Sequence, residues 1–124
     1  MDYQVLTNNP LVEKTYASKC DLRYEEKSVL ELFSLARDLI QKGHKLLTHP
    51  LAGSLKPNET PYRTLLLSKT IEGRVDSESE IIIEECILAT KKFPVRSIVW
   101  PQAILEDFQY VDFTLISNVL AVHG

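Results

Sequence analysis

The residues best suited to chemistry lie in one stretch of the chain, from Gly43 to Lys69. It contains a histidine-proline pair, a lysine-proline pair and the sequence Asn-Glu-Thr-Pro-Tyr. Residues 49–61 include three prolines, which restrict φ and favour an ordered loop over a disordered one. His49 is a candidate acid–base or ligand-contacting group near neutral pH. The alternative is a structural histidine whose ring hydrogen-bonds a loop carbonyl, and the sequence leaves both interpretations open.

The same loop holds a second group of polar residues that suits a carboxylate or a phosphate. Its members are Lys56, Asn58, Glu59, Thr60 and Arg63, with Gly53 and Ser54 as a backbone N–H nest. The alternative is a turn over 58–60 whose side chains bond their own backbone. Neither a Walker A sequence nor G-x-G-x-x-G is present, so no motif supports nucleotide binding.

Two expected strands end in a similar pattern. The first strand ends in Leu-Thr followed by Asn8, Asn9 and a proline. The second strand ends in Leu-Thr48 followed by His49 and a proline. If the two strands are parallel, both ends lie at one edge of the sheet, where ligands bind in open α/β sheets. We therefore expect Asn8, Asn9, Thr48 and His49 to meet the 53–60 loop at one concave surface.

Other reactive groups are few. The three histidines share no metal-ligand spacing and no Cys-x-x-Cys is present, so no metal and no cofactor are expected. Cys86 lies on an apolar helical stripe and is expected to be a core thiol, whereas Cys20, between a lysine and an aspartate, is the one candidate reactive thiol. Because no nucleophile elbow or acid pair is present, no catalytic residue can be assigned.

Three helices are predicted from local signals. Ser28 and Glu31 match a capping box and Gly43 suits a helix end, which predicts a helix over 28–42. A second capping box, Ser77 with Glu80, begins a helix over 77–92. Pro101 suits the first position of a long helix over 101–121.

Strands are expected where β-branched and apolar residues form short runs. These runs are Tyr3–Thr7, Lys45–Thr48, Tyr62–Ser68 and Val95–Trp100, and Val12–Tyr16 is an ambiguous segment with strand as one interpretation. The alternation of strands and helices predicts an α/β fold: a small three-layer domain with a mixed or mostly parallel sheet flanked by helices. The first strand, the 28–42 helix and Lys45–Thr48 would form a right-handed βαβ unit.

Length and composition are those of one soluble globular domain, residues 1–124. The chain is 44% hydrophobic and 25% charged, which is ordinary for that class, and 124 residues suffice for a core. No apolar run is long enough for a membrane span, and the first residues lack the pattern of a secretory signal. A cytoplasmic protein is therefore expected.

Positive charge is concentrated in one segment. Residues 42–74 hold six Lys or Arg and two acids, a net of +4, whereas the whole chain has a net charge of −3. An acidic chain argues against nucleic acid as a partner. The local excess of positive charge suits a small anion or an acidic protein surface, with an ordinary solvated face as the alternative.

The sequence KGHKLLTHPLAGSLKPNETPY, with TNNP near the N-terminus and a helix between them, closely resembles the GrdX family over nearly the whole chain. Members of that family are encoded beside glycine, sarcosine and betaine reductase components of amino-acid-fermenting anaerobic bacteria. The resemblance implies a reductase context and no catalytic residues.

Two functions are compatible with this resemblance. The first is a non-catalytic accessory or regulatory protein that binds glycine reductase components, or a small anionic metabolite, through the 49–63 loop. The second is a small enzyme that acts on a carboxylate or acyl phosphate, with His49 as the acid–base group.

The last predicted helix is unusually apolar. Tyr110, Val111 and Phe113 widen a stripe that would already suffice to cover a sheet. We expect the surplus to meet a second copy in a symmetric homodimer. The alternative is a helix that buries all of these residues within its own domain.

Overall fold

A computed structural model of the chain describes residues 2–51, 60–92 and 100–123. Seven elements follow one another along these residues: β1 (Tyr3–Thr7), α1 (Pro10–Tyr16), β2 (Leu22–Tyr24), α2 (Val29–Gln41), β3 (Thr64–Ser68), α3 (Ser77–Lys92) and α4 (Gln102–His123).

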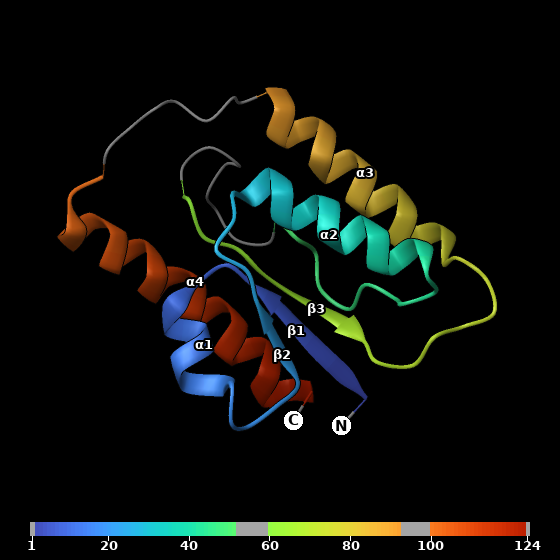
Figure 1. Ribbon diagram of the computed structural model, residues 1–124, viewed down its shortest axis with the longest axis horizontal. Helices are drawn as coiled ribbons and strands as arrows, with labels where there is room; N and C mark the ends of the chain where they lie inside the picture. The colour runs from blue at the N-terminus through green and yellow to red at the C-terminus, as the bar shows by residue number, and fades with distance from the viewer. Residues whose placement is uncertain (1, 52–59, 93–99, 124) are drawn as a thin grey trace.

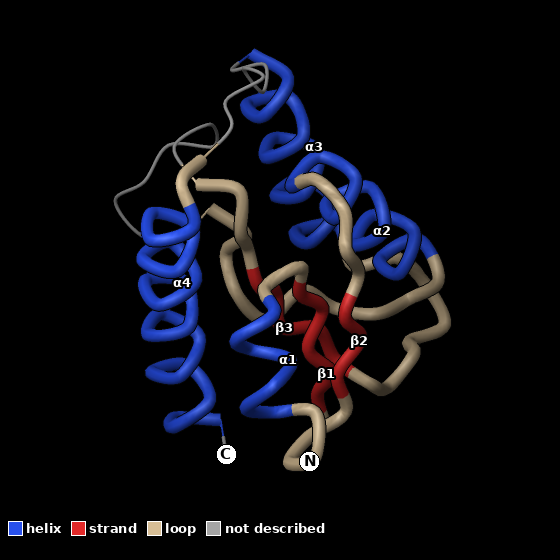
Figure 2. Tube along the Cα trace, turned by 60° about the vertical axis from the view of Figure 1, so that its left-hand side comes forward, coloured by secondary structure: helices blue, strands red, loops and turns tan. Residues whose placement is uncertain are grey.

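The described elements form three layers around a small mixed sheet. The strand order is β2-β1-β3, with β1 parallel to β2 and antiparallel to β3. Helices α2 and α3 pack together on one face, and α1 and α4 cover the other (Figures 1 and 2). The predicted α/β class and the mixed sheet flanked by helices are confirmed.

The apolar run of β3 serves both faces of the sheet. Leu65 and Leu67 point into the core beneath α2 and α3, while Leu66 points into the core beneath α1 and α4. This alternation follows from the two-residue period of a strand. A continuous apolar run is therefore what a strand covered on both faces requires.

Helix α2 forms where its local signals predicted it. The Ser28 hydroxyl accepts from the Glu31 N–H at 3.2 Å, and the Glu31 carboxylate accepts from the Ser28 N–H at 3.2 Å. The Ser28 hydroxyl also donates to the Glu31 carboxylate at 2.9 Å, and the two bonds that this carboxylate accepts from Ser28 lower its pKa. Gly43 follows with a φ of 107°, in the left-handed region that glycine adopts without strain. The capping box and the glycine stop are both confirmed.

Helix α3 is also confirmed, but its predicted cap is wrong. The Asp76 carboxylate, and not Ser77, caps the helix: it accepts from the Ser79 N–H at 3.0 Å and from the Ser79 hydroxyl at 2.6 Å. These bonds lower the pKa of Asp76. An aspartate is as good an N-cap as a serine and adds a negative charge at the positive end of the helix dipole.

Helix α1 replaces the strand considered for Val12–Tyr16. The Asn9 side chain accepts from the Leu11 N–H at 3.0 Å, and Pro10 occupies the first helical position. Proline suits that position because its φ is already helical and the missing N–H has no helical partner there. Strand was therefore the wrong interpretation of this segment.

The sheet differs from the prediction at both edges. Strand β2, which was not predicted, pairs with β1 over three residues. Lys45–Thr48 is not a strand and forms a single antiparallel bridge, Leu46 to Leu67. The 45–48 segment lies beside β3 and not beside β1, so the predicted βαβ unit through α2 is wrong. The parallel crossover connects β1 to β2 through α1 instead. The strand predicted at Val95–Trp100 falls almost entirely on 93–99, outside the described residues.

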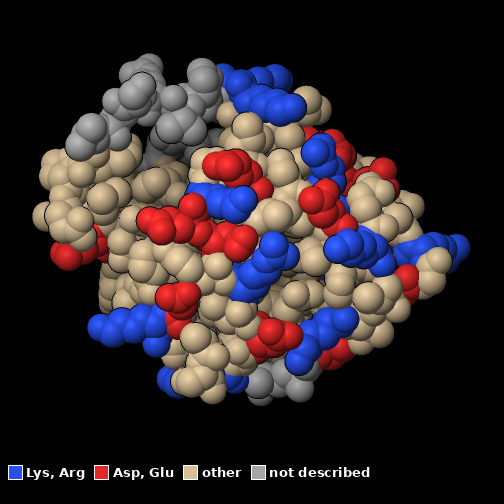
Figure 3. Space-filling model, in the orientation of Figure 1, with Lys and Arg blue, Asp and Glu red and all other residues tan. Residues whose placement is uncertain are grey.

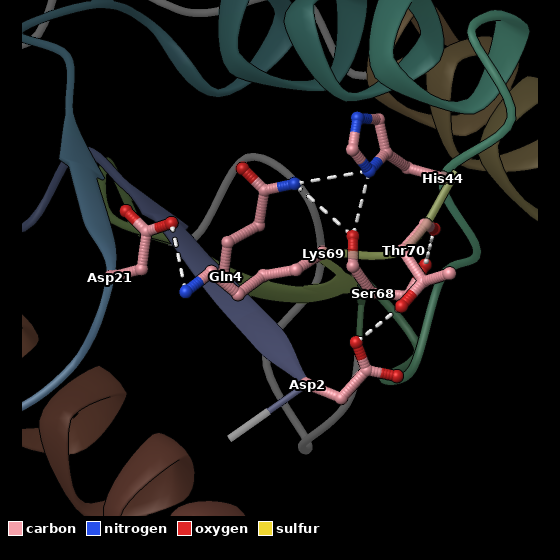
Figure 4. A network of polar contacts seen from close by, with 7 residues as sticks. All are labelled: Asp2, Gln4, Asp21, His44, Ser68, Lys69 and Thr70. Carbon is pink, nitrogen blue, oxygen red and sulfur yellow. Dashed lines mark hydrogen bonds and ion pairs between the residues drawn. The ribbon is translucent and has the colours of Figure 1, made fainter.

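A polar network holds the amino end of β1 to the chain that flanks it (Figure 4). His44 Nδ1 donates to the Ser68 carbonyl at 2.8 Å, and the Gln4 amide donates to the same oxygen at 3.2 Å. Thr70 donates to Asp2 nearby. We call these five residues the amino-end network; it fixes where the chain leaves α2 and passes along β3.

Candidate functional site

The carboxyl end of β1 meets several segments at once: the start of α1, the chain before α2, the end of the 49–63 loop, and α4. The side chains that join them are Thr7, Asn8, Asn9, Arg63, Thr64 and Asp112, which we call the carboxyl-end network. All but Thr64 are buried. Of these, the sequence had pointed to Asn8, Asn9 and Arg63.

Asn8 ties the end of the loop to β1. Its side-chain oxygen accepts from the Arg63 N–H at 2.8 Å, and its amide donates to the carbonyls of Lys27 and Pro61, each at 2.9 Å. The amide N–H groups and one carbonyl lone pair are thereby used within the protein. Asn8 positions the loop.

Asn9 ties α1 and α4 together. Besides capping α1, its amide donates to the Gln109 carbonyl and to Asp112 Oδ2, each at 2.9 Å. The side chain is fully buried. It therefore points into the domain beneath α4, away from solvent.

Asp112 is a buried carboxylate that the sequence analysis missed. Thr64 donates to it at 2.7 Å, and the Thr64 hydroxyl lies 2.7 Å from that of Thr7, so a chain of hydroxyl groups leads to the carboxylate. Burial raises the pKa of Asp112, although the hydrogen bonds from Asn9 and Thr64 and the charge of Arg63 act to lower it. Asp112 lies four residues from both Phe108 and Ile116 in the last helix. An acidic residue at such an apolar position was the signal that could have identified it.

Arg63, the last residue of the 49–63 loop, is only 3% exposed. Its charge acts to lower the pKa of both Asp112 and Cys86, so the guanidinium is close to α4 and to α3. A buried positive charge needs such compensation. Arg63 thus lies in the interior of this end of the domain.

His49 has a ring bonded to its own loop, but the partner is a backbone N–H and not the carbonyl that the structural interpretation predicted. Its Nδ1 accepts from the Leu51 N–H at 3.1 Å, while the side chain is exposed. An accepting Nδ1 leaves the proton of the neutral ring on Nε2. The ring orientation is therefore fixed by its own loop, with Nε2–H as the group available to a ligand.

The remaining loop residues divide between anchors and undescribed positions. Thr48 Oγ1 accepts from the Leu66 N–H at 3.1 Å, and Thr60 Oγ1 accepts from the Tyr62 N–H at 3.2 Å. Both side chains bond the protein's own backbone. The other predicted ligand groups lie outside the described residues: Gly53, Ser54, Lys56, Asn58 and Glu59.

Asn9 and His49 leave the sheet region at the same end. Both β1 and the 45–48 segment run antiparallel to β3, so the two are parallel to each other with β3 between them. The side chains do not converge in the manner expected, because Asn9 is buried and His49 is exposed. Their shared role in binding stays a prediction.

An open depression of about 340 Å³ lies at the carboxyl ends of the parallel strands β1 and β2. Phenol, carboxylate and ammonium groups surround it, which suits a small polar ligand. Its lining includes Asn8, Tyr24, Glu26, Lys27, Ser28 and Tyr62. Sequence reasoning had placed none of residues 24–28 at a site because it did not find β2.

Neither cysteine has the features of an activated thiol. Burial raises the pKa of Cys86 to about 11, and Cys86 belongs to the core as predicted. Burial and the charge of Asp21 also raise the pKa of Cys20, which lowers its thiolate fraction. Among residues 2–51, 60–92 and 100–123, no three His, Cys, Asp or Glu side chains are grouped to hold a metal.

A family model described as GrdX-like protein matches residues 4–121. The chain belongs to the GrdX-like family. The resemblance inferred from the residues is thereby confirmed over nearly the whole chain. No curated protein and no solved structure matches it.

Within the family match, the carboxyl-end network spans the chain from Thr7 to Asp112. On the face shown in Figure 3, basic and acidic residues are interspersed without one continuous patch of either sign. None of the helices in the described part of the chain has the length and apolar character of a membrane span.

Proposed function

We propose that this protein is a cytoplasmic, non-catalytic accessory or regulatory protein of the glycine, sarcosine and betaine reductase system. Its 49–63 loop binds a reductase component or a small anionic metabolite. Membership of the GrdX-like family supports the reductase context.

The observation that carries this proposal is the anchoring of the loop at both ends. Asn8 holds its second end by the Arg63 N–H and the Pro61 carbonyl. At its first end the Leu51 N–H bonds the ring of His49, and Leu51 packs against the core. Ends that are already held in place lower the entropic cost of binding.

Charge supports an anionic ligand or an acidic partner surface. The segment 42–74 has a net charge of +4. Part of that charge, on Arg63, is buried beside Asp112, so Lys56 is the remaining basic residue of the loop. A single lysine acts on an anion as a point charge.

The chemistry of the described residues favours binding over catalysis. Asn8 and Asn9 are used to hold the fold together. The pKa values of both cysteines are raised, and a thiol nucleophile needs the opposite shift.

The alternative, a small enzyme acting on a carboxylate or acyl phosphate, rests on His49. The bond from Leu51 orients the ring and leaves Nε2–H to the solvent side of the loop. A positioned imidazole is what general acid catalysis needs.

Thermal-shift measurements with glycine, acetyl phosphate and nucleotides test the proposal. A ligand at about 100 times its Kd stabilises a protein by about 2.7 kcal/mol, which is several degrees in Tm for a domain of this size. We expect Lys56→Ala to abolish the shift and Lys14→Ala, an exposed lysine on α1, to leave it unchanged.

The same screen separates the two functions. Consumption of the stabilising ligand, lost in His49→Ala, would establish the enzyme instead. If neither these ligands nor purified reductase components bind the wild type, the proposed binding role is wrong.

A further inference from the structure

One side of α4 carries apolar residues at the spacing of a helix-pairing surface. Its members, which we call the α4 seam, are Ile104, Phe108, Val111, Leu115 and Val122. The four aliphatic members are between 37% and 85% exposed. Steps of four, three and four residues, then seven, repeat the a/d pattern by which two helices pack together.

Another side of α4 is already used within its own domain. Ile116 and Leu120 are buried, and Phe113 stacks on Tyr16 with ring centroids 5.9 Å apart. Tyr110 leans toward Phe113 at 6.3 Å. Of the three residues predicted to carry surplus apolar surface, Phe113 packs within the domain, Val111 lies in the α4 seam, and Tyr110 is exposed but lies off it.

We infer that the α4 seam of one molecule packs against the α4 seam of a second copy, with the two helices antiparallel about a two-fold axis. The same patch then serves both subunits, as a two-fold interface requires. Ile104 lies opposite Val122 of the partner subunit, and Val111 lies opposite Leu115 of the partner subunit.

The charges of α4 favour this occupant and this orientation. Glu106 and Asp107 are the exposed charged residues among 102–122, and no Lys or Arg occurs there. A nucleic acid or an anionic membrane would need basic residues. Antiparallel packing keeps the two acidic ends apart, whereas parallel packing would bring four carboxylates together. In Figure 3 the left-hand end of the molecule, where α4 begins in Figure 1, is largely uncharged.

The remaining seam position is polar. Asn118, between Leu115 and Val122, is exposed and completes the a/d spacing. A single asparagine at such a position lowers stability but selects one alignment of the helices. The α4 seam is thus suited to a defined pairing.

The size of the α4 seam sets the expected strength. From Ile104 to Val122 it is about 27 Å long at 1.5 Å per residue. Two helices in contact over that length bury on the order of 1,000 Å² in total, near the lower limit of specific interfaces. We therefore expect a weak dimer with a Kd in the micromolar range.

Sedimentation velocity of the full chain between about 5 and 200 µM tests the inference. The wild type should pass from monomer to dimer, and Val111→Lys with Leu115→Lys should stay monomeric. Tyr110→Lys is the matched control, because Tyr110 is 64% exposed but lies off the α4 seam, and it should still dimerise. Circular dichroism checks that both variants fold.

A wild type that is monomeric at 200 µM overturns the inference, since the α4 seam then meets something other than a second copy. A dimer that survives the double substitution overturns it too, because its interface lies elsewhere.

Disulfide trapping tests the orientation. In a Cys20→Ser background, Ile104→Cys and Val122→Cys are oxidised separately and then as a mixture, with one variant tagged to distinguish it by mass. Antiparallel packing predicts a disulfide only between the two different variants. Cross-linking of Ile104→Cys with itself would indicate parallel helices and overturn the orientation.

Discussion

The two ends of β1 are held by polar networks that differ in burial. In the carboxyl-end network Asn8 is 4% exposed, Asn9 is fully buried and Asp112 is 7% exposed. In the amino-end network the Thr70–Asp2 bond is exposed and the Gln4 bonds are only partly buried. A buried group that loses its partner bears the full cost of desolvation, whereas water replaces a lost partner near the surface.

The difference shows which end can serve as a base for binding. At the carboxyl end the Asn8 side chain alone joins the end of β1 to the chain before α2 and to residues 61 and 63, so this end of the loop is held firmly. At the amino end the contacts mostly hold the chain leaving α2 against β3. Substitutions at the two ends measure this contrast directly.

The largest effect is expected at the carboxyl end, for Asn9→Ala. The change removes the cap of α1 and leaves the Gln109 carbonyl and Asp112 without the Asn9 donor. We expect the free energy of unfolding to fall by about 2–4 kcal/mol, measured by urea denaturation. Gln41→Ala, an exposed amide at the end of α2, is the control. Equal effects of the two changes would contradict the proposed role of the network.

At the amino end the largest effect is steric, at Gly43. An added Cβ would lie 2.4 Å from the Glu72 carbonyl oxygen, and the φ of 107° disfavours any side chain. We expect Gly43→Ala to lower the free energy of unfolding by about 2–3 kcal/mol. Gly73→Ala is the matched control, since nothing lies within 4 Å of its Cβ position. A harmless Gly43→Ala would show that this junction is not packed as described.

A moderate, pH-dependent effect is expected at Asp112. Its pKa is raised in the folded protein by burial, so its contribution to stability is full below the unfolded pKa of about 3.9. The contribution is lost as the pH rises through the higher folded pKa. Asp112→Asn removes this titration and keeps an oxygen for the Asn9 and Thr64 donors.

Urea unfolding of both proteins at pH 4.5 and pH 7.5 checks this sign. Comparison with the variant removes the contributions of Glu31 and Asp76, whose lowered pKa values act in the opposite direction. The wild type should lose stability relative to Asp112→Asn on going to pH 7.5. A gain would mean that the ionised carboxylate is the favoured form in this network.

The smallest effect is expected for Gln4→Ala in the amino-end network. The Gln4 amide bonds the Ser68 carbonyl, which also accepts from His44. Because that acceptor keeps a partner, we expect a loss of only about 0.5–1 kcal/mol. A loss as large as that of Asn9→Ala would erase the contrast between the two ends.

Some features of the fold can be predicted from neighbouring residues, and the start of α1 is one that the sequence analysis missed. Asn9 followed by Pro10 is a helix start, because asparagine caps and proline takes the first position. Because Val12–Tyr16 was left ambiguous, with strand as one interpretation, α1 was missed, and without α1 the crossover to β2 could not be inferred. The signal for a helix start was present, but the residues that follow it could still be interpreted as a strand or as a helix.

The candidate site was predictable only in part. The 49–63 loop stood out by composition, but the His49 ring bonds a backbone N–H of its loop and not the carbonyl that one of the two alternatives named. Asn8 and Asn9 were located correctly at the end of β1, but their structural bonds reach Pro61 and Asp112. No local pattern states which distant group a buried amide will meet.

The sequence by itself determined α2, α3 and α4, the class of the fold and the family. Helical spacing, caps and stops act over three or four residues and do not depend on the rest of the chain.

The tertiary structure decided everything that depends on pairing across the chain. It selected three residues as β2, reduced 45–48 to a single bridge, and joined Asn9 to Asp112 across 103 positions. It also decided which side of α4 is left exposed. Burial and partnership are properties of the packed domain, and they are set by contacts between residues that are far apart in the sequence.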